Sequence, residues 1–118
     1  MPKPQESESI EKYSDMGLET KLVHGGSIRS QFGEVSEAIF LNSGFCYHDA
    51  ETAEKRFNGE EPGYVYSRYR NPSLAMLEDR LCLLEGAESC IAVGSGMAAV
   101  FASLMGILKA GDRVLANK

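Results

Sequence analysis

The residues best suited to chemistry are Gly94, Ser95, Gly96 and Met97, which follow a short apolar run over residues 90–93 and precede a long apolar segment. A glycine-rich turn between a strand and a helix directs unpaired backbone N–H groups at one point. The positive end of the helix dipole faces the same point, where a phosphate is stabilised. The stretch therefore predicts a phosphate-binding turn.

The spacing of the glycines bears on which phosphate compound binds. Gly94, Gly96 and Ala99 fit the pattern G-x-G-x-x-[GA] of a dinucleotide-binding turn. That fold also needs an acidic residue about 20 positions further on to hold the ribose, and none of residues 114–117 is acidic. An ATP-type loop is excluded as well, because no lysine follows Gly96. A single phosphate held by few contacts remains.

A second cluster of phosphate-binding side chains lies upstream, between Tyr64 and Arg70. Arginine presents a planar fork of donors that matches phosphate oxygens, and a phenol hydroxyl can donate to the same group. Tyr66 and Arg68 are two residues apart, so on an extended segment their side chains point to the same side. We expect Tyr66 and Arg68 to act together.

The N-terminal half is expected to be an arm with little regular structure. Residues 1–14 are polar and are expected to form a disordered tail. A short helix is predicted over residues 18–24, ended by Gly25 and Gly26. Residues 27–48 show no clear period, which indicates an extended segment.

Two helices are predicted on either side of the Tyr66 cluster. Asp49 is a good N-cap for a helix over residues 50–57. Asn71 caps the next helix, Pro72 suits its first turn, and Gly86 ends it. The leucines that recur at helical spacing and are expected to form one buried stripe are Leu74, Leu77, Leu81 and Leu84.

The C-terminal part predicts a strand, a helix and a second strand, over residues 90–93, 97–109 and 113–116. The helix is apolar nearly all round, so we expect it to be buried on most sides. This order is typical of the right-handed crossover of a parallel or mixed sheet, which indicates an α/β fold.

Composition excludes several classes of partner. The chain has 12 basic and 17 acidic residues, a net charge of −5, which argues against nucleic acid. No secretory signal and no long apolar run is visible, so we expect no membrane partner and a reduced, cytoplasmic setting. The cysteines, Cys46, Cys82 and Cys90, are expected to be core residues, and His24 and His48 lack metal-ligand spacing, so no metal site is expected.

Short motifs follow one another in a set order between residues 66 and 99. They are Tyr66-Ser67-Arg68, Asn71-Pro72-Ser73, Leu77-Glu78, Leu84-Glu85-Gly86-Ala87-Glu88 and Ser95-Gly96-Met97-Ala98-Ala99. In this order they resemble the Cys/Met-metabolism family of pyridoxal-phosphate (PLP) enzymes, over residues 18–118. The O-succinylhomoserine sulfhydrylase branch is the most similar, judged by residues 41–45 and 53–57 and by Tyr69-Arg70.

The resemblance implies PLP-dependent transferase fold type I, an α/β architecture. This chain would hold an N-terminal arm, residues 15–60, lying against a neighbouring subunit. The start of the PLP-binding domain, with its large mixed sheet, would cover residues 61–118. A dimer is the expected minimum and a tetramer is the family expectation.

The resemblance also assigns cofactor-binding residues. The backbone N–H groups of Gly96 and Met97 would hold the PLP phosphate. Tyr66 and Arg68 would reach across a subunit interface to the phosphate of a neighbour's cofactor. Family members carry the lysine that forms the Schiff base further downstream, so the catalytic residues are unknown here. The segment alone is expected to be inactive, as the N-terminal part of a larger or truncated protein.

The activity implied is γ-replacement on O-succinylhomoserine, an activated homoserine ester. Sulfide would replace the γ-substituent, which leaves as succinate, and give homocysteine for methionine biosynthesis. Two alternatives remain open. Cystathionine γ-synthases and cystathionine lyases of the same family share every motif quoted above, and a non-catalytic remnant would keep the start of the fold without the chemistry.

Overall fold

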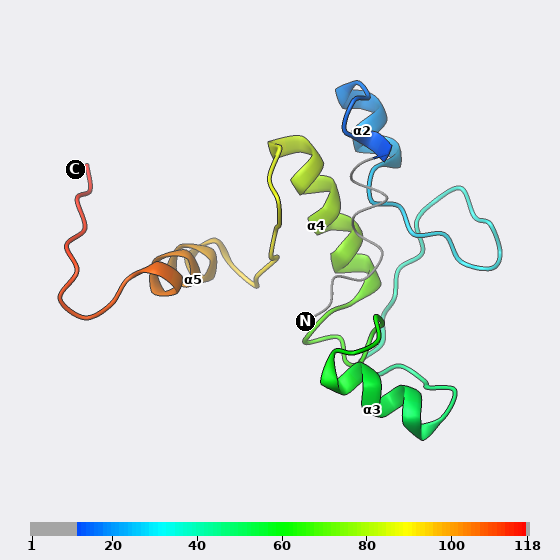
Figure 1. Cartoon of the computed structure of the whole chain (residues 1–118). Coiled ribbons are helices and arrows are strands. Elements are labelled where there is room, and N and C mark those ends of the chain that lie inside the picture. The colour runs from blue at the N-terminus through cyan, green and yellow to red at the C-terminus, as the bar shows by residue number, and fades with distance from the viewer. Residues whose placement is uncertain (1–11, 118) are drawn as a thin grey trace.

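The computed structural model describes residues 12–117, and its helices follow one another along an open chain (Figure 1). They are α2 (Leu18–His24), α3 (Ala50–Asn58), α4 (Pro72–Glu85) and α5 (Gly96–Ile107). None of the helices in this part of the chain is long and apolar enough to cross a membrane. Most of the predicted tail lies outside the described residues, and its last part leads into a turn in which the Met16 N–H donates to the Tyr13 carbonyl at 3.1 Å.

The helix ends confirm the predictions made from capping residues. Asp49 accepts the Thr52 N–H at 2.7 Å at the start of α3. Asn71 accepts the Ser73 N–H at 2.9 Å at the start of α4. Gly86 ends α4 with φ of 63°, in the left-handed region that glycine adopts without steric cost.

Helix α4 packs against α2 through a face other than the predicted one (Figure 1). The α4 residues that are buried are Pro72 in the first turn and then Ala75, Met76, Asp79, Cys82 and Leu83. Leu74, Leu77 and Leu81 are exposed and Leu84 is half-buried, so the predicted leucine stripe is not the buried face.

The reason lies in the two glycines after α2. A Cβ on Gly25 would come within 2.4 Å of the Leu83 Cδ1 atom. A Cβ on Gly26 would come within 2.9 Å of the Asp79 Cβ. Gly26 also has φ of 69°. Because the backbone approaches α4 this closely, it selects the face of α4 that carries Asp79 and Leu83.

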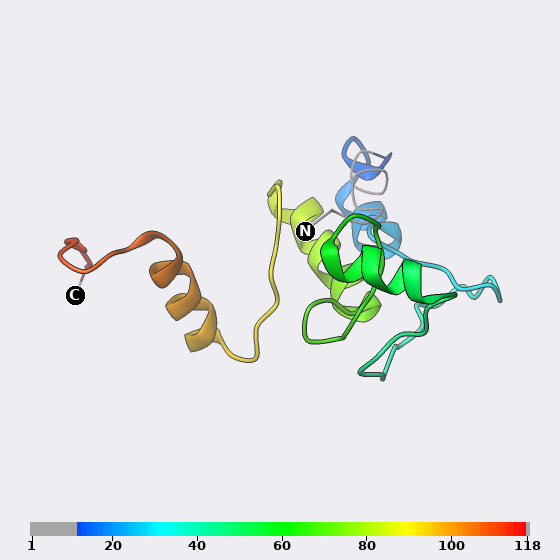
Figure 2. The same ribbon diagram turned by 60° about the horizontal axis from the view of Figure 1, so that its bottom comes forward.

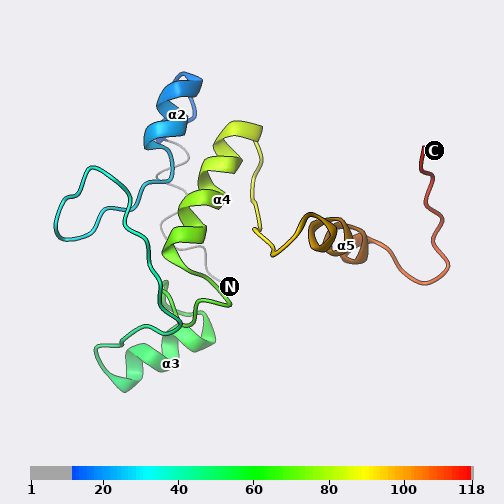
Figure 3. The ribbon, with the colours of Figure 1, turned by 180° about the vertical axis from the view of Figure 1, so that it is seen from behind.

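The middle part of the arm, residues 27–48, contains no helix, as predicted, and is held to α4 by side chains. The guanidinium of Arg80 donates to the Gly25 carbonyl at 3.1 Å and to the Ser27 hydroxyl at 3.4 Å, and it forms an ion pair with Glu37. The first half of the arm loops away from α4 between these contacts, and the second half runs toward α3 (Figures 1 and 3).

Helix α5 stands apart from α2, α3 and α4 in all three views (Figures 1, 2 and 3). It ends at Ile107, two residues before the predicted end, because Leu108 is extended with φ of −96° and ψ of 147°. The apolar side chains of α5 are exposed, contrary to the prediction that most would be buried. No other element of the described chain packs against them.

The predicted strands over residues 90–93 and 113–116 are not formed in the part of the chain that the structure describes. A strand needs a neighbour to accept its backbone hydrogen bonds, and neither segment has one here. Residues 90–93 are instead extended, and the Ala92 N–H donates to the Glu78 carboxylate at 2.7 Å. That bond ties this linker to α4.

Candidate phosphate-binding site

The first part of the candidate site is the N-terminus of α5. Ser95 caps the helix, because its hydroxyl oxygen accepts the Ala98 N–H at 3.1 Å and its carbonyl accepts the Ala99 N–H at 3.1 Å. The N–H groups of Gly96 and Met97 come earlier in the helix and have no acceptor within it. They point toward the end of the helix where the dipole is positive.

Access to these N–H groups is open. Gly94, Gly96 and Met97 are exposed. A Cβ built on Gly94 or Gly96 meets no atom within 4 Å. The described chain therefore leaves room for an oxyanion at this helix end, and a phosphate fits the two amide donors.

The second part of the site is the turn that carries Tyr66 and Arg68. The Tyr66 carbonyl accepts the N–H groups of Tyr69 at 2.9 Å and Arg70 at 3.1 Å, which closes a tight turn. The segment was predicted to be extended, and this prediction is wrong. The downstream residues fold back on the Tyr66 carbonyl, whereas spacing alone assumes a straight backbone.

The turn nevertheless brings Tyr66 and Arg68 together. The Arg68 guanidinium carbon lies 5.5 Å from the centre of the Tyr66 ring and 5.6 Å from that of Tyr69. All three side chains are exposed. A cation held over aromatic rings gains about 0.5 to 1 kcal/mol at exposed sites. Arg68 is thus partly ordered, and its donors face solvent.

Contacts with the arm fix the position of this turn. Gly44 and Tyr66 form an antiparallel bridge, and the Ser67 N–H donates to the Ser43 carbonyl at 2.8 Å. The Tyr47 hydroxyl donates to the Val65 carbonyl at 3.2 Å. These bonds pair the arm with the backbone on both sides of Tyr66.

Asn71 joins the turn to α4, a role that its sequence signal as an N-cap did not reveal. Its side-chain amide donates to the Ser67 hydroxyl at 2.9 Å and to the Phe40 carbonyl at 3.0 Å, while its oxygen accepts the Ser73 N–H. Asn71 is buried. The partners Phe40 and Ser67 are distant in sequence, so no local pattern indicates them.

A buried carboxyl lies near the turn. Burial raises the pKa of Asp79, the positive charge of Arg70 partly opposes this effect, and Glu78 adds to it. Burial, followed by the negative charge of Asp79, raises the pKa of Tyr64. Asp79 belongs to the buried face of α4, so we assign it to packing and not to the phosphate site.

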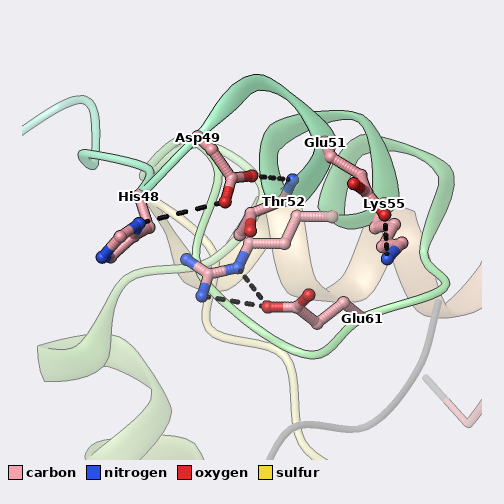
Figure 4. A network of polar contacts seen from close by, with 7 residues as sticks. His48, Asp49, Glu51, Thr52, Lys55 and Glu61 are labelled. Atoms are coloured by element: carbon pink, nitrogen blue, oxygen red, sulfur yellow. Dashed lines mark hydrogen bonds and ion pairs between the residues drawn. The ribbon is translucent and has the colours of Figure 1, made fainter.

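Helix α3 and the residues beside it carry a network of polar contacts (Figure 4). His48 lies 3.9 Å from Asp49, and Lys55 lies 2.6 Å from Glu51 (Figure 4). The hydrogen bond from Thr52 lowers the pKa of Asp49. The described residues contain no group of three or more His, Cys, Asp or Glu that could hold a metal. This network stabilises α3.

The cysteines differ from one another in burial. Cys82 is buried and Cys90 is half-buried, but Cys46 is exposed, so the prediction of a core role is wrong for Cys46. No disulfide joins any of the three within the described residues. Cys46 lies in the arm, where few residues are buried because no layer of the described chain covers it.

Within one chain the two parts of the site are not brought together. The turn at Tyr66 lies between α3 and α4, whereas the N-terminus of α5 lies beyond the extended linker that follows α4 (Figures 1 and 2). One chain therefore presents two separate candidate groups for phosphate binding. They are an open helix N-terminus and an arginine–tyrosine pair.

Comparison with known proteins defines the class. The family model of the Cys/Met metabolism PLP-dependent enzymes matches residues 19–118, and the chain belongs to this family. Over 96 residues it is 54% identical to an O-succinylhomoserine sulfhydrylase of Mycobacterium tuberculosis, covering 81% of this chain and 24% of the relative. An O-succinylhomoserine sulfhydrylase of Pseudomonas aeruginosa is 43% identical over 101 residues, covering 86% and 25%.

Other relatives carry a different activity in their names. An L-methionine gamma-lyase of Porphyromonas gingivalis is 38% identical over 102 residues, covering 86% of this chain and 26% of the relative. The chain thus spans about a quarter of the length of the curated relatives it matches.

A solved structure gives the fold class. The chain matches a protein from Campylobacter jejuni described as an O-acetylhomoserine (thiol)-lyase, with a TM-score of 0.77 and 35% identity. The match covers 83% of this chain and 24% of that one, which holds N'-pyridoxyl-lysine-5'-monophosphate. The predicted family, the type I fold and the PLP cofactor are confirmed. The open amide donors of α5 fit the phosphate of that cofactor.

Proposed function

We propose that the protein carrying this chain replaces the succinyloxy group of O-succinylhomoserine with sulfide, which releases succinate and gives homocysteine for methionine biosynthesis in the cytoplasm. The observation that carries the proposal is the 54% identity to an O-succinylhomoserine sulfhydrylase. A second sulfhydrylase at 43% identity supports it. The methionine gamma-lyases among the relatives are 33 to 39% identical.

In this proposal Gly96 and Met97 hold the PLP phosphate through their backbone N–H groups. Tyr66 and Arg68 donate to the same kind of phosphate from a neighbouring subunit. When bound, PLP supplies an electron sink for reactions of amino-acid substrates. The residues of this chain would bind and orient the cofactor. The exposed Arg68 donors and the open N-terminus of α5 support these roles.

The same roles make the protein a homo-oligomer, at least a dimer and by family expectation a tetramer. The separation of the Tyr66 turn from α5 within one chain supports a site completed by a second copy (Figures 1 and 3). The arm, residues 15–60, would lie against that copy, and residues 61–118 would begin the cofactor domain. The exposed apolar residues of the arm, such as Phe32, Val35 and Leu41, support this division.

A substrate-pair assay of the complete enzyme tests the function. O-succinylhomoserine is supplied with sulfide or with cysteine, and L-methionine is supplied alone. We expect homocysteine from the sulfide reaction to exceed the other products. Faster formation of cystathionine would identify a cystathionine γ-synthase. Faster breakdown of L-methionine would identify a γ-lyase, which the 38% identical relatives favour as the second candidate. No turnover of any pair would indicate a non-catalytic protein.

A further inference from the structure

Ser67 stands between the two side chains of the proposed phosphate contact, and its backbone and hydroxyl are both engaged. Its N–H donates to the Ser43 carbonyl at 2.8 Å. Its hydroxyl donates to the Asn42 carbonyl and accepts from the Asn71 side-chain amide at 2.9 Å. A serine hydroxyl has one proton to donate, and here that proton is committed to the arm.

The partners of Ser67 belong to two independent elements. Asn42 and Ser43 lie in the arm, and Asn71 is the buried cap of α4. Asn71 is itself fixed, because its amide also donates to the Phe40 carbonyl and its oxygen accepts the Ser73 N–H. The hydroxyl of Ser67 therefore links the turn to the arm and to α4 at one point.

We infer that Ser67 is a positioning residue for the PLP phosphate, acting through Tyr66 and Arg68. The inference rests on the proposed function. Arg68 is exposed, so its guanidinium is held mainly by two aromatic rings and by the backbone that carries it. Without the hydroxyl, the turn keeps its backbone bonds and the bond from the Tyr47 hydroxyl to the Val65 carbonyl, but it loses its link to Asn71 at the start of α4. Arg68 then has more conformations to lose when it meets a phosphate, which lowers affinity.

The chain offers a matched control in Ser73. Its hydroxyl oxygen accepts the Phe40 N–H at 2.8 Å, so it also joins the arm to the start of α4. Ser73 lies inside α4, outside the turn that carries Tyr66 and Arg68. Ser67→Ala and Ser73→Ala each remove one hydroxyl from the contact between the arm and α4, and only the first removes a support of the turn.

The test measures dissociation constants of PLP and of pyridoxal, which lacks the phosphate, on the complete apoenzyme. We expect Ser67→Ala to weaken PLP about fivefold, the loss typical of one hydrogen bond, and to leave pyridoxal unchanged. Ser67→Thr should restore the affinity for PLP. Ser73→Ala should lower the melting temperature but leave PLP binding unchanged. In the double variant Ser67→Ala/Arg68→Ala, the two losses should not add.

Three results would overturn the inference. They are an unchanged affinity of Ser67→Ala for PLP, an equal loss for PLP and pyridoxal, and an equal loss of PLP affinity in Ser73→Ala. Arg68→Ala separates the inference from the proposed function. If Arg68→Ala leaves PLP affinity unchanged, the phosphate contact itself is wrong. If Arg68→Ala weakens PLP and Ser67→Ala does not, only the positioning role of Ser67 is wrong.

Discussion

At the scale of single residues, the proposed phosphate contact depends most on Arg68. We expect Arg68→Ala to weaken PLP binding by about 1.5 to 3 kcal/mol, the range for a charge-assisted hydrogen bond, or about 10- to 150-fold. Arg68→Lys keeps the charge but not the planar fork, so its loss should be smaller. Absorbance titration of the complete apoenzyme with PLP measures both. An Arg68→Lys variant that binds PLP as tightly as the unchanged enzyme would contradict a role for the fork.

A substitution at Gly96 should change phosphate binding without changing the stability of the fold. A Cβ at this position meets no atom within 4 Å, so Gly96→Val should leave the melting temperature of the chain nearly unchanged. The added side chain would stand where the phosphate approaches, and PLP affinity should fall by more than in Arg68→Ala. The control is Gly106→Val, because Gly106 lies in the same helix and is equally open. A similar loss of PLP affinity in Gly106→Val would contradict the phosphate role of Gly96.

Much of the candidate site could be predicted from residue types and spacing. Gly96, Met97, Tyr66 and Arg68 stand in short motifs, and each motif has a chemical reason that a sequence displays. The support of the turn by Ser67 could not be predicted, because its partners in the arm lie 25 residues away and a serine hydroxyl has no local signature.

At the scale of elements, helix ends were predicted and helix faces were not. The caps Asp49 and Asn71 bond to residues two or three positions away, so local sequence specifies them. The buried face of α4 depends on where Gly25 and Gly26 approach it, a contact between segments more than 50 residues apart. A stripe of leucines indicates that a helix has an apolar face. The segment that packs against the helix decides which face is buried.

Alanine substitutions on the two faces of α4 should lower the free energy of unfolding by different amounts. Met76 is 3% exposed and Leu77 is 47% exposed. Met76→Ala should cost about 2 to 5 kcal/mol of unfolding free energy, because it leaves a cavity. Leu77→Ala should cost less than about 1 kcal/mol, as a surface change. Urea unfolding of the 118-residue chain measures both. A larger loss for Leu77→Ala would show that the leucine stripe is the packed face.

The cap of α3 predicts a dependence on pH. The hydrogen bonds from Thr52 lower the pKa of Asp49 below its ordinary value of 3.8. The stabilisation is therefore present above that ordinary value and is lost as the pH falls through the lowered pKa. The amide resonance of Thr52 in NMR spectra should follow this loss. In Asp49→Asn the cap remains without a titrating group, so the Thr52 resonance should no longer shift with pH.

At the scale of the whole molecule, a site shared between subunits predicts complementation. One protomer carries Arg68→Ala and its partner carries Gly96→Val. A mixed dimer then holds one site with both defects and one site with neither. Random mixing of equal amounts makes half the dimers mixed, so about a quarter of the sites should regain PLP binding. Titration with PLP counts these sites. No recovery after subunit exchange would contradict the proposed sharing of Tyr66 and Arg68.

Whether the two predicted strands form and whether α5 is buried also depend on the whole molecule. The sequence of this chain alone could not predict either one. The sequence of an apolar helix or of a β-prone run shows that the segment can be buried. Burial itself requires the other layers of the fold. In the described chain those layers are missing around α5, and its apolar residues stay exposed.

The loop that forms the first half of the middle part of the arm is anchored at both ends. Gly25 and Gly26 pack against α4 at one end, and the Phe40 carbonyl accepts from the Asn71 amide at the other. Between these anchors Gln31 is exposed, so a fluorescent amino acid placed there would disturb neither anchor. Its emission would then act as a reporter of subunit association, independent of cofactor loading. A probe in this loop would therefore allow the assembly of subunits to be followed in real time.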